Sequence, residues 1–221
     1  MSGTSPYYAF NRADIAQHIP EWATRVLDVG CASGAFGGLL KSLGVSEVIG
    51  IEVEPDVCAA AQDVLDCAIC GDIETMDLPF EGGYFDCIVF GDVLEHLKNP
   101  GEVLKRVAPF LGPDGEVLAS IPNVRFYDVI RALGEGRWEY QDAGILDRTH
   151  LRFFTAVEMQ KLFADAGYEV VTLLPLSRAV GIPRNPDGTV TAGKVTIGPV
   201  DEAEYQDLLT YQYLIVGRKP L

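Results

Sequence analysis

The sequence predicts an α/β protein built on one mostly parallel sheet with helices on both faces. Short apolar runs alternate with longer segments of helical periodicity from residue 25 to residue 122. The apolar runs are nearly continuous, which is typical of parallel strands that are buried on both faces. Prolines and glycines stand at the expected helix boundaries: Pro55 and Pro100 begin two helices, and Gly44 and Gly112 follow two helix ends.

The elements follow one another regularly through this region. Strands are expected over residues 25–30, 47–52, 67–72, 85–92 and 115–122, and helices over residues 36–43, 55–65 and 100–111. This rhythm of strand, helix and strand predicts a parallel sheet that is covered on both faces.

The rhythm changes after residue 120. Residues 122–153 are rich in aromatic residues and arginine, and we expect them to form an insertion that acts as a substrate lid. A helix resumes with Thr155 as its N-cap and Gly167 as its C-terminal stop. Two final strands are expected over residues 168–176 and 211–219, and the stretch between them, 178–204, is expected to be a long loop because it lacks periodicity.

The chain length and charge bound the class of protein. The 221 residues fit one domain over 1–221, with residues 1–20 as an N-terminal flap or helix. Acidic residues outnumber basic ones 32 to 17, for a net charge of −15, so nucleic acid and anionic membranes are not expected partners. The N-terminus carries no signal-peptide pattern, and no apolar run approaches the ~20 residues of a spanning helix. We therefore expect a cytoplasmic protein.

The five cysteines predict reduced thiols rather than a disulfide framework. Cys31, Cys58 and Cys87 sit among apolar or small residues. Cys67 and Cys70 form one C-x-x-C pair, but neither a second pair nor a histidine cluster follows it. Because a tetrahedral zinc site needs four ligands, no metal site is expected.

A small-residue loop follows the first predicted strand. Gly30, Ala32 and Gly34 lie between that strand and a helix, where they let the backbone approach a ligand closely. In parallel α/β sheets, ligands bind at the carboxyl ends of the strands. The next two strands end at Glu52, which is placed to accept from ribose hydroxyls, and Asp72, which is placed to accept from an exocyclic amine.

The ligand of this loop is either a nicotinamide dinucleotide or S-adenosylmethionine (SAM). A dinucleotide fingerprint has glycine at the second position of G-x-G-x-x-G, where this chain has Ala32. Asp28 precedes the loop, and its negative charge suits the ammonium of a methionine moiety better than a pyrophosphate. The charge pattern therefore favours SAM.

Five motifs together resemble those of class I SAM-dependent methyltransferases: residues 26–34, 50–56, 71–74, 85–100 and 111–123. The resemblance implies a Rossmann-like fold with a seven-stranded sheet of order 3-2-1-4-5-7-6, an antiparallel last strand and an insertion after strand 5. Residues 7–20 and 142–155 are further similar to bacterial methyltransferases of sugar, cell-surface and natural-product pathways.

The resemblance also assigns the cofactor site residue by residue. It implies that the methionine end is held by Asp28, Gly30, Ala32 and Gly34, the ribose by Glu52, the adenine by Asp72 and Ile73, and that Phe90, Gly91 and Asp92 line the cofactor near its sulfonium. Ala32 departs from the glycine that many members carry there.

Histidines are the candidate bases for a hydroxyl acceptor. His150 lies in the insertion, where Asp147 could pair with it, and His96 follows the fourth strand. Either histidine could instead have a structural role. His18 lies on the N-terminal segment and is assigned no role.

The insertion and the N-terminus supply the candidate substrate contacts. The arginines of the insertion could recognise a carboxylate or phosphate on a small substrate, or they could form ordinary ion pairs with their acidic neighbours. Ion pairs are expected for most of them, and Arg152 and Tyr127 are kept as candidates for the substrate pocket. Tyr7 and Tyr8 are expected to close over the cofactor as a flap.

The function expected from these residues is methyl transfer from SAM to a small molecule, at oxygen first and nitrogen next. The alternatives are a nicotinamide-dependent oxidoreductase and a SAM-binding regulatory protein without catalysis. Neither the acceptor nor the oligomeric state can be read from the sequence, because specificity in this fold resides in the variable lid.

Overall fold

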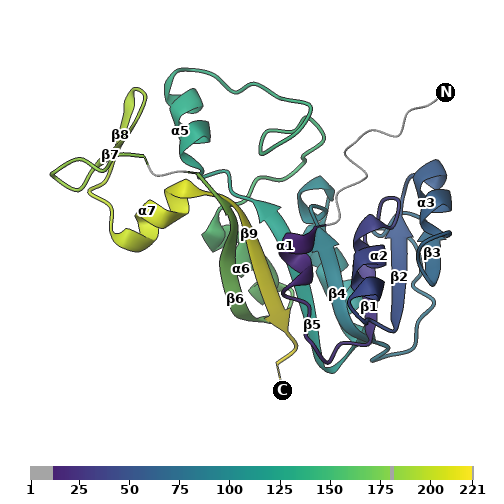
Figure 1. The fold of residues 1–221 in the computed structure, drawn as a ribbon. Coiled ribbons are helices and arrows are strands. Elements are labelled where there is room, and N and C mark those ends of the chain that lie inside the picture. Colours follow the sequence, from purple (N-terminus) through teal and green to yellow (C-terminus); the bar gives the residue numbers. More distant parts are fainter. Residues whose placement is uncertain (1–11, 180–181, 221) are drawn as a thin grey trace.

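A computed structural model describes residues 12–179 and 182–220 of the chain. Its main sheet has the strand order β3-β2-β1-β4-β5-β9-β6 (Figure 1). The strands of this sheet are β1 (Arg25–Val29), β2 (Glu47–Glu52), β3 (Cys67–Cys70), β4 (Phe85–Gly91), β5 (Leu111–Pro122), β6 (Glu169–Arg178) and β9 (Thr210–Arg218). Strands β1 to β5 pair in parallel, and β9 is antiparallel to both β5 and β6. The predicted order and the antiparallel last strand are confirmed.

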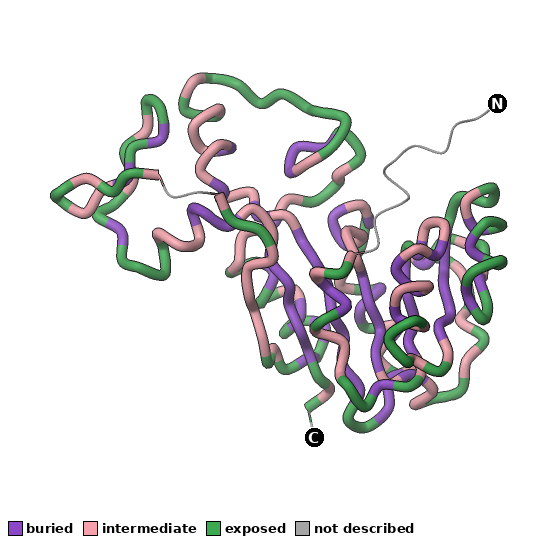
Figure 2. The backbone as a smooth tube through the Cα atoms, in the orientation of Figure 1, coloured by how far each residue is buried: buried purple, intermediate pink, exposed green. Residues whose placement is uncertain are grey.

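Helices cover both faces of the sheet. One face packs against α1 (Ala13–Ala16), α2 (Ala35–Ser42) and α3 (Pro55–Ala61), and the other against α4 (Pro100–Val107) and α6 (Ala156–Asp165). Each face of the sheet has its own apolar cluster, and neighbouring residues of a strand point to opposite clusters. On β1, for example, Val26 belongs to one cluster and Leu27 to the other. Figure 2 shows the buried strands between these layers. Within the described part of the chain, no helix is both long and apolar enough to cross a membrane.

Two 3-10 turns complete this core. They are η2 (Leu94–His96), directly after β4, and η3 (Ala108–Phe110), between α4 and β5. The helix predicted after residue 155 is α6, and its signals are confirmed: the Thr155 side chain accepts a hydrogen bond from the backbone N–H of Glu158, and Gly167 has φ 91° just after the helix.

The expected loop over residues 178–204 is partly ordered, which corrects the sequence prediction. It contains the hairpin of β7 (Val190–Ala192) and β8 (Val195–Ile197) and the start of α7 (Glu202–Leu209). The hairpin packs beside α5 (Tyr127–Gly134), beyond the end of the sheet (Figure 1). Strands of three residues are too short to show a period of two, so the prediction missed them.

The cysteines also differ from the prediction of reduced thiols. Cys58 on α3 and Cys70 at the end of β3 form a disulfide, with their Cα atoms 5.7 Å apart. Cys31, Cys67 and Cys87 are free. The pairing depends on the packing of α3 against β3, which the spacing of cysteines along the sequence does not reveal.

Candidate functional site

A cavity of about 1070 Å³ opens where β1, β2 and β4 end. Its lining comes from segments that are far apart in the sequence but meet at the carboxyl ends of the parallel strands. These segments include residues 28–32, 51–54, 71–74, 91–93, 95–98, 142–144 and 147–150, together with Arg12, Tyr211 and Gln212. The cavity therefore joins the predicted cofactor residues to the insertion.

The loop after β1 is held tightly against the end of β2. The N–H groups of Gly30 and Cys31 donate to the carbonyl of Ile51, at 2.8 and 3.1 Å. The Glu52 carboxylate accepts from the N–H of Ala32 at 3.0 Å. Gly30 has φ 73°, and a Cβ there would lie 2.5 Å from Cγ2 of Val93, so glycine is needed for both conformation and space.

Ala32 adopts the left-handed conformation, with φ 49°. This region disfavours residues that carry a Cβ, at a cost of roughly 1–2 kcal/mol. The hydrogen bond to Glu52 keeps the Ala32 N–H in place. Glu52 thus shapes the loop, a role that adds to its predicted contact with ribose.

Asp28 is a buried acid at the glycine loop. Asp28 is 4% exposed, and its Oδ2 atom has no hydrogen-bond partner among the described residues. Burial, together with the neighbouring Glu52 carboxylate, raises the pKa of Asp28 to about 7. A buried acid in this state favours a cationic ligand, which would pair with the carboxylate and lower its pKa. The ammonium of SAM fits this requirement.

Some of the remaining predicted cofactor residues line the cavity, and others do not. Asp72, Ile73, Gly91 and Asp92 line the cavity, but Gly34 and Phe90 are not among its lining residues. Phe90 is fully buried in the apolar core. Gly34, with φ 85°, is the N-cap position of α2, and a Cβ there would lie 3.2 Å from atoms of the Val64 and Leu65 side chains. Both therefore shape the fold behind the cavity.

Asp92 connects β4 to the N-terminal segment. Its carboxylate forms an ion pair with Arg12 and accepts hydrogen bonds from Ser120, at 2.9 Å, and from Gln212. Arg12 and Gln212 also line the cavity. Neither residue was predicted from the sequence, because the two come from opposite ends of the chain and no local pattern links them to Asp92.

The two candidate histidines meet at the cavity. Their ring centroids are 4.7 Å apart, with the rings nearly perpendicular. Nδ1 of His150 lies 3.0 Å from the carbonyl oxygen of Ile145, and because a carbonyl only accepts, we assign the proton to Nδ1. The Nε2 atom of His150 is then left with a lone pair.

The tautomer of His96 follows from its neighbour Thr149. The Thr149 hydroxyl donates to the Asp147 carboxylate at 2.6 Å, so its oxygen is left to accept from Nδ1 of His96 at 3.2 Å. His96 therefore also presents an unprotonated Nε2. Burial, followed by the neighbouring His150, lowers the pKa of His96, which keeps it neutral at pH 7.

The predicted pairing of Asp147 with His150 is corrected by these contacts. Among the described residues, Asp147 is bonded through its carboxylate to the N–H and the hydroxyl of Thr149, and it reaches His96 through that hydroxyl. Although burial favours the neutral acid, these hydrogen bonds hold the pKa of Asp147 below its usual range. Asp147 thus orients His96 rather than His150.

Glu95 is a further buried acid, and it was not predicted as a site residue from the sequence. It is 1% exposed, and neither carboxylate oxygen has a partner among the described residues. Burial raises the pKa of Glu95 well above its ordinary value, with a further rise from Asp92. One carboxylate oxygen of Glu95 and one ring nitrogen each of His96 and His150 lie within 4.8 Å of one another. No metal site was predicted; in the part of the chain that the structure describes, these three residues form the group that could hold a metal ion.

The predicted substrate residues lie elsewhere. Tyr127 packs its ring on Phe126 at 4.9 Å, and Arg152 donates to the carbonyls of Leu151, at 3.1 Å, and Lys98. Neither Tyr127 nor Arg152 is among the residues that line the cavity. The proposed flap residues at positions 7 and 8 lie outside the described part of the chain.

The other arginines of the insertion form ion pairs, in agreement with the simpler of the two interpretations. These pairs are Arg125 with Asp207, Arg131 with Asp128, Arg137 with Glu135, and Arg148 with Asp142. The insertion therefore offers the cavity little free positive charge.

Comparison with known proteins identifies a family. Residues 7–173 match the family described as "Methyltransferase domain". The chain is 24% identical over 165 residues to "Ubiquinone biosynthesis O-methyltransferase" of Burkholderia pseudomallei, covering 72% of this chain and 70% of that protein. It is 26% identical over 191 residues to "Uncharacterized 37.1 kDa protein in transposon TN4556" of Streptomyces fradiae, covering 76% of this chain and 52% of the relative, about half of that relative's length.

Solved structures share the fold. A SAM-dependent methyltransferase from Archaeoglobus fulgidus superposes with a TM-score of 0.65 at 20% identity, covering 94% of this chain and 92% of the other. A possible histamine N-methyltransferase from Thermotoga maritima gives a TM-score of 0.62 at 17% identity, with 96% and 89% covered. At these identities the likeness concerns the fold alone.

Proposed function

Because this chain belongs to the methyltransferase-domain family, we propose that it transfers a methyl group from SAM to an oxygen atom of a small molecule. One observation carries the proposal. The same cavity contains a buried carboxyl group at the glycine loop, Asp28, whose Oδ2 has no partner among the described residues, and two imidazoles whose Nδ1 atoms are hydrogen-bonded, His96 and His150. The Asp28 carboxylate suits a cationic cofactor, and the two imidazoles suit an acceptor that must lose a proton.

The cofactor half of the site is assigned to strand-end residues. Asp28 would pair with the ammonium group, Glu52 would accept from the ribose hydroxyls, and Asp72 and Ile73 would meet the adenine. Gly91 and Asp92 would lie near the sulfonium. When bound, SAM supplies a methyl group on a positively charged sulfur. The task of the protein is to align the acceptor with that methyl and to remove the proton of the acceptor.

The proton of an acceptor hydroxyl would pass to Nε2 of a neutral imidazole. His96 is held in the required tautomer by Thr149, and Asp147 fixes the Thr149 hydroxyl. His150 is held by the Ile145 carbonyl. These hydrogen bonds prepare both rings to accept a proton before the acceptor arrives.

The charges around the histidines favour a neutral or cationic acceptor. Asp92 and Asp147 line this end of the cavity beside Glu95, whose raised pKa favours its neutral form. Three cations line the cavity: Arg12 is paired with Asp92, Arg148 is paired with Asp142 at 2.7 Å, and Lys98 forms no ion pair among the described residues. An acceptor with a carboxylate beside its reacting atom would meet like charges here. The same acidic surroundings make an amine the second candidate acceptor.

The relatives support oxygen as the first choice, because several curated relatives carry the name "Ubiquinone biosynthesis O-methyltransferase". The nicotinamide alternative has no counterpart among the reported relatives.

The test is methyl transfer from radiolabelled SAM to catechol, dopamine and 3,4-dihydroxybenzoate, which share two ring hydroxyls and differ in charge. We expect catechol and dopamine to be methylated faster than the carboxylate. Replacing His150 or His96 with glutamine should lower the rate by about 10²–10⁴-fold for the residue that acts as the base, with S-adenosylhomocysteine (SAH) binding unchanged. His18→Gln is the matched control, because His18 is not among the residues that line the cavity.

Two outcomes would contradict the proposal. Binding of NAD without binding of SAM would remove the methyl-transfer function. Unchanged methylation rates in both histidine variants would exclude His96 and His150 as the general base. Dialysis against EDTA, followed by addition of Mg²⁺ or Zn²⁺, separates proton transfer from metal assistance at Glu95, His96 and His150.

A further inference from the structure

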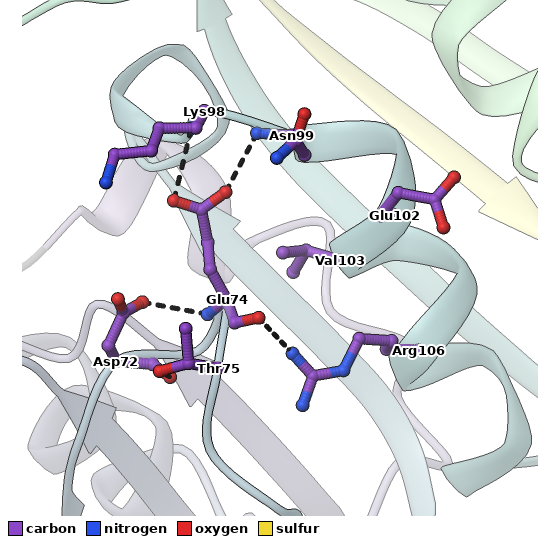
Figure 3. Close-up of a pocket in the computed structure, with 8 residues that line it drawn as sticks. All are labelled: Asp72, Glu74, Thr75, Lys98, Asn99, Glu102, Val103 and Arg106. Carbon is purple, nitrogen blue, oxygen red and sulfur yellow. Dashed lines mark hydrogen bonds between the residues drawn. The ribbon is translucent and has the colours of Figure 1, made fainter.

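The loop of residues 71–76 forms a wall between two hollows. On one side lies the large cavity, and on the other a depression of about 190 Å³ (Figure 3). Asp72, Glu74 and Lys98 line both. Any shift of this loop would therefore move the proposed adenine contacts, Asp72 and Ile73.

Glu74 ties the loop to the start of α4. Its carboxylate accepts from the backbone N–H groups of Lys98, at 3.2 Å, and Asn99, at 2.8 Å (Figure 3). The next residue, Pro100, has no N–H to offer. A carboxylate at this end of the helix is also stabilised by the helix dipole. Glu74 thus fixes one point of the loop to a rigid element.

Arg106 ties the same loop to the last turn of α4. Its guanidinium donates to the carbonyls of Ile73, at 3.0 Å, Glu74 and Met76. Among the described residues no carboxylate forms an ion pair with Arg106, so its hydrogen bonds go to these main-chain oxygens. The donors of a guanidinium are fixed in one plane, so three carbonyls can meet it only in a particular loop conformation.

Internal hydrogen bonds complete the loop. The Asp72 carboxylate accepts from the N–H of Glu74 at 2.8 Å, and the Asp72 carbonyl accepts from Thr75 and Met76 at 3.0 and 2.9 Å. The N–H of Gly71 donates to the Glu52 carbonyl at 2.9 Å. The loop is therefore joined to β2 on one side and to α4 on the other.

We propose that Glu74 and Arg106 are positioning residues that set the selectivity of the site for adenine. This inference rests on the proposed function, in which Asp72 and Ile73 meet the adenine of SAM. Neither Glu74 nor Arg106 needs to touch the base. They hold the Asp72 carboxylate where it accepts from the exocyclic amine and where it repels a base that has a carbonyl oxygen in place of that amine.

The test compares binding of SAH with binding of S-inosylhomocysteine, which differs at that amine, by calorimetry. The unmodified protein should bind SAH at least about tenfold more tightly. Arg106→Met keeps most of the apolar stem but removes the donors, and it should bring the ratio of the two affinities close to one. Arg106→Lys retains one charged donor group and should give an intermediate ratio. Glu74→Gln, which keeps one amide oxygen as an acceptor, should also give an intermediate ratio.

Lys105→Met is the matched control, because Lys105 lies on the same helix and pairs with the exposed Glu102. It should leave the ratio unchanged. The ratio is insensitive to a loss of folded protein, because both ligands report on the same folded fraction. An unchanged ratio in Arg106→Met and Glu74→Gln, with SAH still bound, would overturn the positioning role alone. Failure of the unmodified protein to bind SAH would overturn the proposed function and this inference with it.

Discussion

Replacing Asp28 with asparagine should make the ligand-free protein more stable above neutral pH and impair its binding of SAM. Asp28 is buried, its Oδ2 has no partner among the described residues, and burial raises its pKa from 3.8 to about 7. The carboxylate form is therefore disfavoured until a cation arrives. Asparagine has nearly the same shape but carries no charge at any pH.

The size and sign of the effect follow from this pKa. A rise of about 3 pKa units at about 1.4 kcal/mol per unit corresponds to ~4 kcal/mol. Because the folded state binds this proton more tightly than the unfolded state, the contribution to stability is full below pH 3.8 and is lost as the pH rises through about 7. The free energy of unfolding of Asp28→Asn should therefore match that of the unmodified protein near pH 4 and exceed it by up to ~4 kcal/mol at pH 8.

Urea unfolding at pH 5 and pH 8 measures the stability difference, and calorimetry measures SAM binding. Below pH 7 the apparent dissociation constant of SAM should rise by about tenfold per pH unit, because Asp28 must lose its proton to pair with the ammonium. Asp28→Asn should bind SAM about 10–100-fold more weakly and lose that component of the pH dependence. Asp63→Asn, at an exposed position, is the control. An equal stability difference at both pH values, together with unchanged SAM affinity, would refute the reasoning.

Three further predictions concern the scaffold of the site. Ala32→Gly removes the strain of a left-handed alanine but adds chain entropy to the unfolded state. Urea unfolding should therefore show a net gain of about 0.5 kcal/mol in the free energy of unfolding, with SAM affinity kept within about twofold. A loss of stability would contradict the strain at Ala32. Thr155→Ala removes an N-cap and should lower the free energy of unfolding by about 1 kcal/mol, whereas Thr155→Ser should not. Reduction of the disulfide between Cys58 and Cys70, which are separated by 12 positions, should lower the free energy of unfolding by about 3 kcal/mol. Mass spectrometry after alkylation without reductant should find both cysteines unmodified.

The strands and their order could be predicted from the sequence because their signals are local. The apolar run over 47–52 coincides with β2, and the run over 85–92 contains all of β4. Each run is bounded by residues that stop a strand or begin a helix. Once the crossovers are right-handed, the carboxyl ends of β1, β2 and β4 must fall on one edge, which explains why residues such as Asp28 and Asp72 meet at one cavity.

The hairpin and α7 show where local signals were present but weak. The N-terminus of α7 carries a capping box, in which Asp201 accepts from Glu204 N–H and the Glu204 side chain accepts from Asp201 N–H. This pattern of an aspartate followed three positions later by a glutamate was readable in the sequence. The three-residue strands β7 and β8 had no comparable signal, because their position depends on packing against α5.

The contacts of the acceptor end could not be predicted for a different reason. Arg12 pairs with Asp92 across 80 positions, and Gln212 bonds to the same carboxylate across 120. The proximity of such groups is produced by tertiary packing, and the sequence around each of them is ordinary. His150 was a candidate, but its actual partner is a main-chain carbonyl, which any residue at position 145 would supply.

This difference between the two ends of the cavity has a functional consequence. At the cofactor end, the backbone conformation itself restricts the residues, as at Gly30, where a Cβ would collide with Val93. At the acceptor end, side chains from separate segments converge. Arg12 and Asp92 have positive φ angles there, of 44° and 58°, but Glu95, His96 and His150 do not. Substitutions of these last three residues can change the charge and shape offered to the acceptor without disturbing the loop after β1, which we propose holds SAM. A change of acceptor in this fold therefore requires new side chains in the insertion and after β4, while the loop after β1 stays as it is.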